Sequence, residues 1–226
     1  MSFFVKEVVG QEWGIYYELT GAGYGGLVAA LVILLLAGCV VSGRGGERKI
    51  STKQLVFSAM AIALAMATSM IKLADMPMGG SVTLCSMLFI CLVGYFFGLW
   101  GGLMAAVAYG ILQLVVDPYI ISIPQLLTDY IFGFGALGLS GIFCNKKHGL
   151  VLGYLAGALG RYFFTVLSGM IFFGSYAANF HMSALAYSLA YNGAYLGPEV
   201  LATVAVLSLP PVARGLGRVK GMARGH

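Results

Sequence analysis

The stretch Tyr187-Ser188-Leu189-Ala190-Tyr191-Asn192-Gly193-Ala194-Tyr195-Leu196-Gly197-Pro198-Glu199 places three tyrosines, an amide and a carboxylate inside a long apolar run. Lipid offers no partners for an amide or a carboxylate, so a segment that only filled a bilayer would not carry them. On a helix, Asn192, Tyr195 and Glu199 stand at i, i+3 and i+7 and share one face. We expect this face to line a binding site enclosed by protein.

The composition around this stretch is that of an integral membrane protein. Only 9% of the 226 residues are charged and 60% are hydrophobic, whereas a soluble domain carries about 25% charged residues. A membrane-spanning helix needs roughly 20 predominantly apolar residues, and the sequence offers about seven such runs. We place them at residues 25–41, 51–71, 82–97, 125–143, 150–173 and 187–209. One more follows a turn at residues 98–102 and runs to residue 116. The prediction is an all-α membrane bundle.

The basic residues orient these spans. Ten of the thirteen Lys and Arg fall on one side: Arg44, Arg48, Lys49, Lys53, Lys146, Lys147, Arg214, Arg218, Lys220 and Arg224. Cytoplasmic loops carry such an excess, and residues 1–20 are acidic and aromatic, which suits the outer face. The N-terminus is therefore predicted outside and the C-terminus in the cytoplasm. The net charge of +5 then reflects orientation in a lipid membrane, and no nucleic-acid partner is expected.

The same pattern divides the chain into three parts. Residues 1–50 form an outer segment with an additional transmembrane helix, residues 51–212 form the main membrane domain, and residues 213–226 form a basic cytoplasmic tail after Pro210-Pro211. In the span at 51–71, Ala59 and Ala63 form a small-xxx-small pair, and so do Ala61 and Ala65. Such pairs let helix backbones approach closely in lipid. The alanines cover more than one face, which fits internal packing, an external partner, or both.

Three ionisable residues lie within predicted spans: Asp129, Arg161 and Glu199. Each costs about 2.5–3.5 kcal/mol at a helix centre, so partners are expected. Arg161 and Glu199 each lie twelve residues from the outer end of an adjacent span, about 18 Å deep at about 1.5 Å per residue. We predict a structural ion pair between them below the site.

Asp129 lies only one turn into its span, beside Tyr130. Two interpretations stand: a solvated or capping aspartate at a helix start, or a carboxylate that receives a cationic or hydrogen-bonding ligand from outside. A ligand entering from outside would be walled by Asp129-Tyr130, by residues 165–173 and by residues 187–192. The tyrosines also suit interfacial anchoring, but Asn192 does not.

Motifs of other functions are absent from the sequence. It contains no GxxxxGK[ST] phosphate-binding loop, no HExxH motif and no CxxC pair among its four cysteines. Nucleotide hydrolysis by that route and zinc chemistry are therefore not expected of this chain. No metal site or catalytic residue is predicted.

Several motifs in series resemble one family. They are Pro77-Met78-Gly79-Gly80-Ser81-Val82-Thr83-Leu84, Tyr109-Gly110-Ile111-Leu112-Gln113-Leu114, Asp117-Pro118-Tyr119-Ile120, Pro124-Gln125-Leu126-Leu127-Thr128-Asp129-Tyr130, Ser168-Gly169-Met170-Ile171-Phe172-Phe173 and Tyr187-Ser188-Leu189-Ala190-Tyr191-Asn192-Gly193. In this order, over residues 53–209, they resemble the thiamine-specific S components of energy-coupling-factor (ECF) transporters. The resemblance implies a six-helix S-component bundle in residues 51–212, to which residues 1–50 add a helix.

The resemblance also implies a function. Such a protein captures thiamine from outside a prokaryotic plasma membrane, without catalysis or a cofactor of its own. It docks onto a transmembrane coupling protein whose two cytoplasmic ATPases use ATP. The docking positions correspond to Ala59 and Ala63. The substrate-binding positions correspond to Asp129, Tyr130, Gly169, Tyr187, Asn192, Phe173, Thr165 and the region of Gly80 and Ser81.

Two departures from the family bear on the ligand. Thr165 stands where a histidine is common, and Phe173 stands where some members carry tryptophan, which loses an N–H donor. A thiamine precursor or another vitamin is therefore an alternative ligand. A membrane-embedded enzyme acting on a small amphiphile, with Asp129 and Glu199 catalytic, and a solitary channel are alternatives from other classes. The different depths of Asp129 and Glu199 argue against a shared catalytic site.

Overall fold

The computed structural model describes residues 5–10, 14–23, 51–76 and 80–225. The predicted first span at 25–41 lies outside these residues. The helices that build the membrane domain are α2 (Thr52–Ser69), α3 (Ser86–Val116), α4 (Ile123–Leu126), η2 (Leu127–Gly133), η3 (Ala136–Phe143), α5 (Gly149–Phe172), η4 (Gly174–Phe180), α6 (Ala184–Ser208) and α7 (Pro210–Arg224). Two antiparallel hairpins accompany them: β1 (Val5–Gly10) with β2 (Gly14–Leu19), and β3 (Lys72–Asp75) with β4 (Ser81–Thr83).

Helix α3 is two helices joined at Gly98, as the predicted turn at 98–102 requires. Gly98 has φ +83°, a conformation that glycine adopts at no steric cost. A straight helix of 31 residues would be about 46 Å long, yet Ser86 at one end and Asp117 after the other line the same cavity. The chain therefore reverses at Gly98, and residues 86–97 and 99–116 run back alongside each other.

Close backbone contacts hold the centre of the bundle. A Cβ atom on Gly102 would lie 2.8 Å from the carbonyl oxygen of Gly138, and one on Gly138 would lie 2.5 Å from the backbone nitrogen of Leu103. Glycine at both positions lets α3 and η3 approach more closely than any side chain would allow. This packing accounts for part of the high glycine content.

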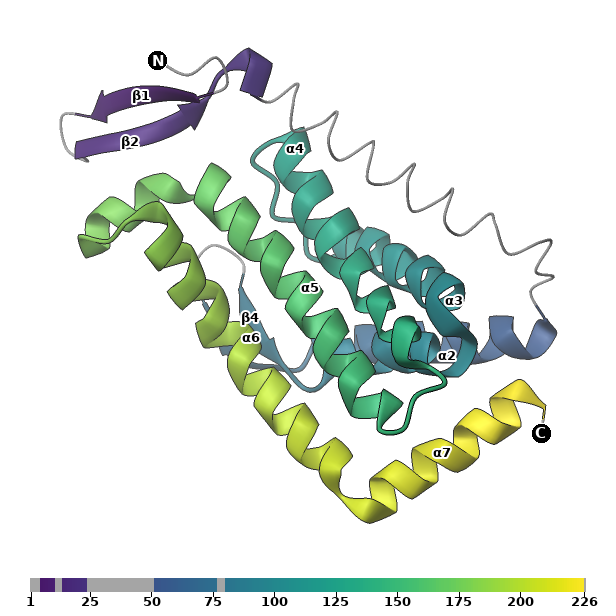
Figure 1. The fold of residues 1–226 in the computed structure, drawn as a ribbon. Helices are drawn as coiled ribbons and strands as arrows, with labels where there is room; N and C mark the ends of the chain where they lie inside the picture. The colour runs from purple at the N-terminus through teal and green to yellow at the C-terminus, as the bar shows by residue number, and fades with distance from the viewer. Residues whose placement is uncertain (1–4, 11–13, 24–50, 77–79, 226) are drawn as a thin grey trace.

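Helices α5 and α6 lie side by side, and α7 turns away from the end of α6 to run beneath the bundle (Figure 1). The two helices meet at an angle of 83°, since α7 begins at Pro210-Pro211 and proline cannot continue the preceding helix. The predicted basic tail is thus a helix whose Ala223 is buried against the bundle. The β1–β2 hairpin lies at the opposite end (Figure 1).

Three helical stretches are long and apolar enough to cross a membrane: Ser86–Val116, Ile123–Phe143 and Gly149–Phe172. The bent pair of α6 and α7 adds a fourth among the described residues. Seven spans were predicted. One of these lies outside the described residues, two are the halves of α3, and the span at 51–71 corresponds to α2, which does not meet this criterion.

Candidate functional site

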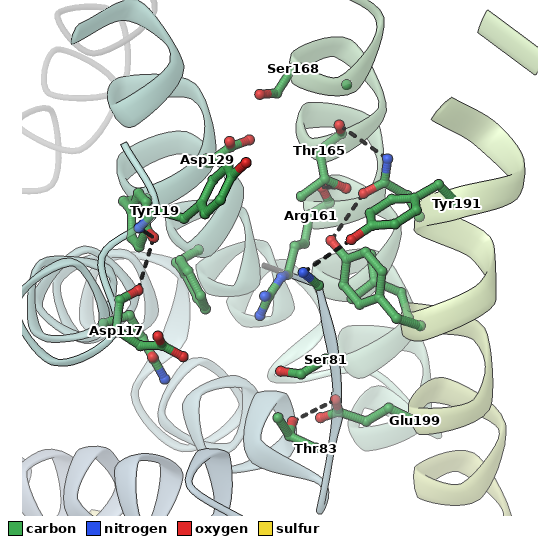
Figure 2. Close-up of a pocket in the computed structure, with 18 of the residues that line it drawn as sticks. Ser81, Thr83, Asp117, Tyr119, Asp129, Arg161, Thr165, Ser168, Tyr191 and Glu199 are labelled. Atoms are coloured by element: carbon green, nitrogen blue, oxygen red, sulfur yellow. Dashed lines mark hydrogen bonds between the residues drawn. The ribbon is translucent and has the colours of Figure 1, made fainter. Parts of the chain in front are cut away.

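A cavity of about 160 Å³ opens between α3, η2, α5, α6 and the β3–β4 hairpin. All nine residues that the sequence predicts for the substrate site line it: Gly80, Ser81, Asp129, Tyr130, Thr165, Gly169, Phe173, Tyr187 and Asn192. They come from four separate segments of the chain. Figure 2 shows Asp129 and Tyr119 on one side, Tyr191 on the other, and Glu199 below.

The predicted polar face of α6 forms one wall. Asn192, Tyr195 and Glu199 are 4%, 7% and 4% exposed, and all three line the cavity. The Asn192 amide donates to the Ser188 carbonyl at 2.9 Å and to the Thr165 carbonyl at 3.3 Å, while its oxygen accepts from the Tyr195 hydroxyl at 3.0 Å. These bonds hold the amide in one orientation and tie α6 to α5.

Gly169 allows the two helices to meet at this wall. A Cβ atom there would overlap the Ser188 hydroxyl and lie 3.3 Å from the Asn192 amide nitrogen. Any larger residue would displace Asn192 or separate α5 from α6. Gly169 therefore shapes the site through the absence of a side chain.

Asp129 and Tyr130 stand on the opposite wall in η2, a π-helical turn. Such turns are rare and often mark functional sites. The Asp129 carboxylate accepts a hydrogen bond from Gln125 Nε2 at 2.6 Å. The capping interpretation of Asp129 is wrong, because Ser122 is the N-cap of this helical stretch and its side chain accepts from the Gln125 amide.

The Tyr130 hydroxyl is occupied by the backbone of the preceding loop. It accepts from the Tyr119 amide at 2.8 Å and donates to the Asp117 carbonyl at 3.1 Å. A ligand would therefore meet the ring of Tyr130 rather than a free hydroxyl. The two bonds also fix the position of Tyr119, which lines the cavity.

Two aromatic stacks line the cavity toward the end where α5 stops and α6 begins, which we call its mouth. Tyr119 stacks on Phe173 with ring centroids 5.9 Å apart, and Tyr187 stacks on Tyr191 at 6.0 Å. Tyr187 also stacks on Phe180 at 5.3 Å, and a ring at the end of such a stack can present its remaining face to a planar or cationic ligand. The individual role of Tyr119 was not predicted, although it belongs to the quoted motif Asp117-Pro118-Tyr119-Ile120.

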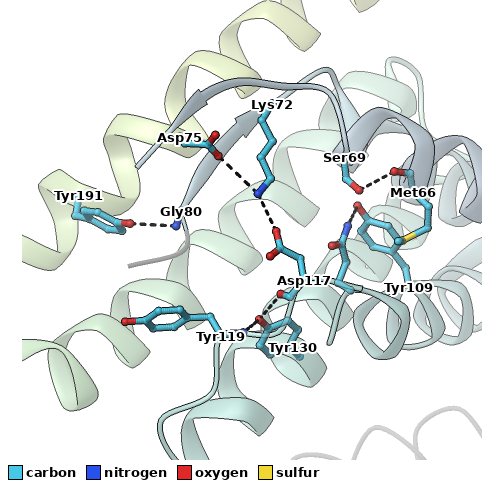
Figure 3. A network of polar contacts seen from close by, with 11 residues as sticks. Met66, Ser69, Lys72, Asp75, Gly80, Tyr109, Asp117, Tyr119, Tyr130 and Tyr191 are labelled. Atoms are coloured by element: carbon cyan, nitrogen blue, oxygen red, sulfur yellow. Dashed lines mark hydrogen bonds and ion pairs between the residues drawn. The ribbon is translucent and has the colours of Figure 1, made fainter. Parts of the chain in front are cut away.

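The β3–β4 hairpin closes the cavity between these stacks. The Gly80 amide donates to the Tyr191 hydroxyl at 3.1 Å. In strand β3, Lys72 contacts Asp117 at 2.9 Å and Asp75 at 3.6 Å (Figure 3). The hydrogen bond to Asp117 raises the pKa of Lys72 above its usual value. This contact could not be predicted from the sequence, in which Lys72 and Asp117 are ordinary loop charges.

Glu199 forms the floor, and its partners differ from the prediction. Its carboxylate accepts from Thr83 Oγ1 at 2.7 Å, from the Met87 amide at 3.2 Å and from Ser86 Oγ at 3.4 Å. The Met87 amide lies in the first turn of α3, where the helix dipole favours a negative charge. Glu199 therefore ties α6 to the start of α3 and to β4.

The predicted ion pair between Arg161 and Glu199 is not formed, and within the described residues no carboxylate lies within 4 Å of Arg161. The guanidinium carbon of Arg161 lies instead 3.9 Å from the centre of the Phe134 ring. Both Arg161 and Glu199 line the cavity. The two residues were predicted to lie at equal depth in the membrane. The rotation of each helix about its own axis instead gives each side chain other neighbours.

The two alanine pairs of α2 point in different directions. Ala61 and Ala65 are buried against the bundle, whereas Ala59 and Ala63 are exposed. The exposed pair is flanked by Leu55, Met60 and Leu64, which are 63%, 56% and 48% exposed. One face of α2 therefore serves internal packing and the other remains available.

Comparisons with known proteins place this arrangement in a family. Residues 55–216 match the model of a family described as thiamine transporter protein. Thiamine transporter ThiT of Bacillus subtilis strain 168 is 34% identical over 149 residues, covering 60% of this chain and 77% of that protein. A solved structure of ThiT from Listeria monocytogenes aligns with a TM-score of 0.57 at 23% identity, over 70% of this chain and 94% of that one.

The solved structure supports the fold, while the family model and the Bacillus relative establish the relationship. The family model covers well over half of the chain and begins just after the N-terminal segment. These matches confirm the family that the motifs in series indicated. The chain belongs to the thiamine transporter protein family.

Proposed function

We propose that this chain is the substrate-capture (S) component of an ECF-type importer, which binds thiamine from the outer side of the membrane. The observation that carries the proposal is the single cavity on which all nine predicted binding residues converge. The chain is a multi-pass membrane transporter and not an enzyme, because its family and its relative are transporters. This membership removes the enzyme alternative.

The charge of the cavity suits thiamine. Asp129 and Glu199 contribute two carboxylates and Arg161 one guanidinium, while Lys72 and Asp117 pair with each other. The lining therefore has a net charge of about −1 when all of these groups are ionised. Thiamine is a permanent monocation, so its binding would neutralise the cavity.

The aromatic groups suit the two rings of thiamine. The Tyr119–Phe173 and Tyr187–Tyr191 stacks stand at the mouth, and cations are stabilised over such rings by about 0.5–2 kcal/mol. Asp129 supplies the opposite charge within the same enclosure. A cationic heteroaromatic ligand would thus have both its charge and its ring faces satisfied.

A thiamine precursor remains the second candidate ligand because of Thr165. Its hydroxyl donates to the Arg161 and Tyr162 carbonyls of its own helix, each at 3.1 Å. The hydroxyl is therefore engaged locally, and this position offers no ring to stack on the ligand. Fewer contacts to a second ring would reduce the preference for the complete two-ring molecule.

The family resemblance and the exposed alanine face of α2 support partners of the ECF type. The exposed Ala59 and Ala63 form a small-residue face on which another helix can pack closely. The chain has no phosphate-binding loop, so ATP would be hydrolysed by two cytoplasmic ATPases bound through a transmembrane coupling protein. We place the protein in a prokaryotic plasma membrane with its N-terminus outside and its C-terminus cytoplasmic.

Calorimetry with purified protein in detergent tests the ligand. We expect saturable thiamine binding in the micromolar range or tighter, and a loss of about 10- to 100-fold for Asp129→Asn because a charged contact is removed. Asp75→Asn, whose side chain is 70% exposed, is the matched control and should bind as the wild type does. No saturable binding of thiamine or its precursors would refute the proposal.

Cellular uptake tests the docking face separately. Ala63→Trp should leave thiamine binding intact while it abolishes ATP-dependent uptake in cells, because a bulky ring prevents close helix approach. Leu159→Trp, at a position 64% exposed on α5, is the control for a large residue facing lipid. Normal uptake by Ala63→Trp would exclude this face as the docking site.

A further inference from the structure

Arg161 is a half-buried cation in the cavity wall that lacks the partner expected of it. Its Nε atom is buried, and no described residue accepts a hydrogen bond from it. Within the described part of the chain no carboxylate lies within 4 Å of the guanidinium, and the predicted partner Glu199 is held by Thr83, Ser86 and Met87. The unpaired Nε carries a cost, and the terminal N–H groups of the same guanidinium form no hydrogen bond or ion pair among the described residues, so a ligand in the cavity that accepts from these terminal groups would gain affinity.

The geometry of Arg161 leaves its edge available. The guanidinium carbon lies 3.9 Å from the centre of the Phe134 ring, so one flat face is covered. A guanidinium that stacks through its face still donates hydrogen bonds through the N–H groups in its plane. Figure 2 shows the side chain extending into the space between Asp129 and Tyr191, above Ser81 and Glu199.

The charges around the cavity decide what kind of acceptor fits. Asp129 and Glu199 also line the cavity, so an anionic ligand would meet two carboxylates. A neutral oxygen on a cationic molecule avoids this repulsion and still accepts from Arg161. Thiamine carries one such group, the alcohol of its hydroxyethyl chain.

We propose that Arg161 is a specificity-determining residue that donates a hydrogen bond to the alcohol oxygen on the side chain of the cationic ligand. The inference rests on the proposed function, since it takes thiamine as the ligand. It also orients the ligand: the alcohol points inward toward Arg161, and the rings lie nearer the aromatic stacks at the mouth. Arg161 then selects ligands that bear this oxygen over those that lack it.

The test compares the affinities of thiamine and of an analogue whose hydroxyethyl group is replaced by ethyl. Wild-type protein in detergent should prefer thiamine by about 10- to 100-fold, the range for a hydrogen bond from a charged donor. In Arg161→Met and Arg161→Gln the ratio should fall below a third of the wild-type value, while Arg161→Lys should keep part of the preference. Arg214→Met, exposed at the other end of the molecule on α7, should leave the ratio unchanged.

The ratio is informative even where a variant binds both ligands weakly, because a merely structural defect lowers both affinities together. A wild-type ratio near one, or an unchanged ratio in both Arg161→Met and Arg161→Gln, would overturn the role of Arg161 and leave the proposed function standing. If neither Met nor Gln yields folded protein, an unchanged ratio in Arg161→Lys, which should keep only part of the preference, has the same consequence. Wild-type protein that binds neither compound would refute the proposed function itself.

Discussion

Removing the Glu199 carboxylate should strongly destabilise the protein. The side chain is 4% exposed and accepts hydrogen bonds from Thr83, Met87 and Ser86 at 2.7, 3.2 and 3.4 Å. A hydrogen bond to a charged group contributes about 1.5–3 kcal/mol. The longest of the three adds little, so Glu199→Ala should cost about 3–5 kcal/mol, the range for breaking a buried charged contact.

Thermal unfolding in detergent, followed by far-ultraviolet circular dichroism, measures this loss. For a chain of this size 1 kcal/mol corresponds to about 2–4 °C, so the midpoint should fall by roughly 6–20 °C. Glu199→Gln keeps an oxygen acceptor without the charge and should lose about half as much. Asp75→Ala, with a side chain 70% exposed, should unfold within about 2 °C of the wild type.

Two results would refute this reasoning. A Glu199→Ala midpoint within about 2 °C of the wild type would show that the three contacts stabilise little. The double variant Arg161→Ala/Glu199→Ala supplies the second test. No hydrogen bond or ion pair joins the two side chains in the described structure, so their effects should add to within about 0.5 kcal/mol. A coupling free energy above about 1 kcal/mol would instead restore the ion pair between them.

Two further predictions follow from the same geometry. Gly169→Ala should weaken thiamine binding by at least about 10-fold in calorimetry, because the added Cβ overlaps the Ser188 hydroxyl and displaces Asn192. Gly197→Ala is the control and should bind normally, since a Cβ atom there would meet nothing within 4 Å. Equal thiamine affinities of the two variants would argue against the close approach of α5 and α6. Lys72→Met should lower the free energy of unfolding slightly at low salt, by the roughly 0–1 kcal/mol typical of exposed pairs. The pKa of Lys72 is raised from 10.5. Its contribution to the free energy of unfolding is therefore fully present below about pH 10.5 and is lost as the pH rises through the higher pKa of the folded state. If the stability difference between wild type and Lys72→Met disappeared between pH 6 and 9, that result would contradict this contact.

The polar cavity wall on α6 could be predicted because it depends on local spacing. Asn192, Tyr195 and Glu199 share a face of any regular helix with those intervals, and all three line the cavity. The turn at Gly98 could likewise be predicted, since Gly98-Leu99-Trp100-Gly101-Gly102 interrupts a run too long for one span. The basic tail at 213–226 was not predicted to be a helix, because composition identified its charge and side of the membrane but not its packing beneath α2 and α3.

The pairing of side chains across the site belongs to the tertiary structure. Counting residues from the outer surface placed Arg161 and Glu199 at the same depth, but depth along two helices does not determine the rotation of each about its own axis. That rotation, set by packing, turns Glu199 toward Thr83 and Met87 and Arg161 onto the Phe134 ring. The loop contact of Tyr119 with Tyr130 arises in the same way.

The sequence by itself determined that this is a membrane bundle and which face of its last span carries the polar groups, because composition and helical periodicity are properties of the chain alone. Only the tertiary structure decided which groups those polar residues meet, because partners from distant segments are chosen by how the helices rotate and pack. The stretch from Tyr187 to Glu199 illustrates both points. Tyr187 and Asn192 line the cavity, as helical spacing and the motif indicated. The Glu199 carboxylate binds the start of α3 and not Arg161, the predicted partner.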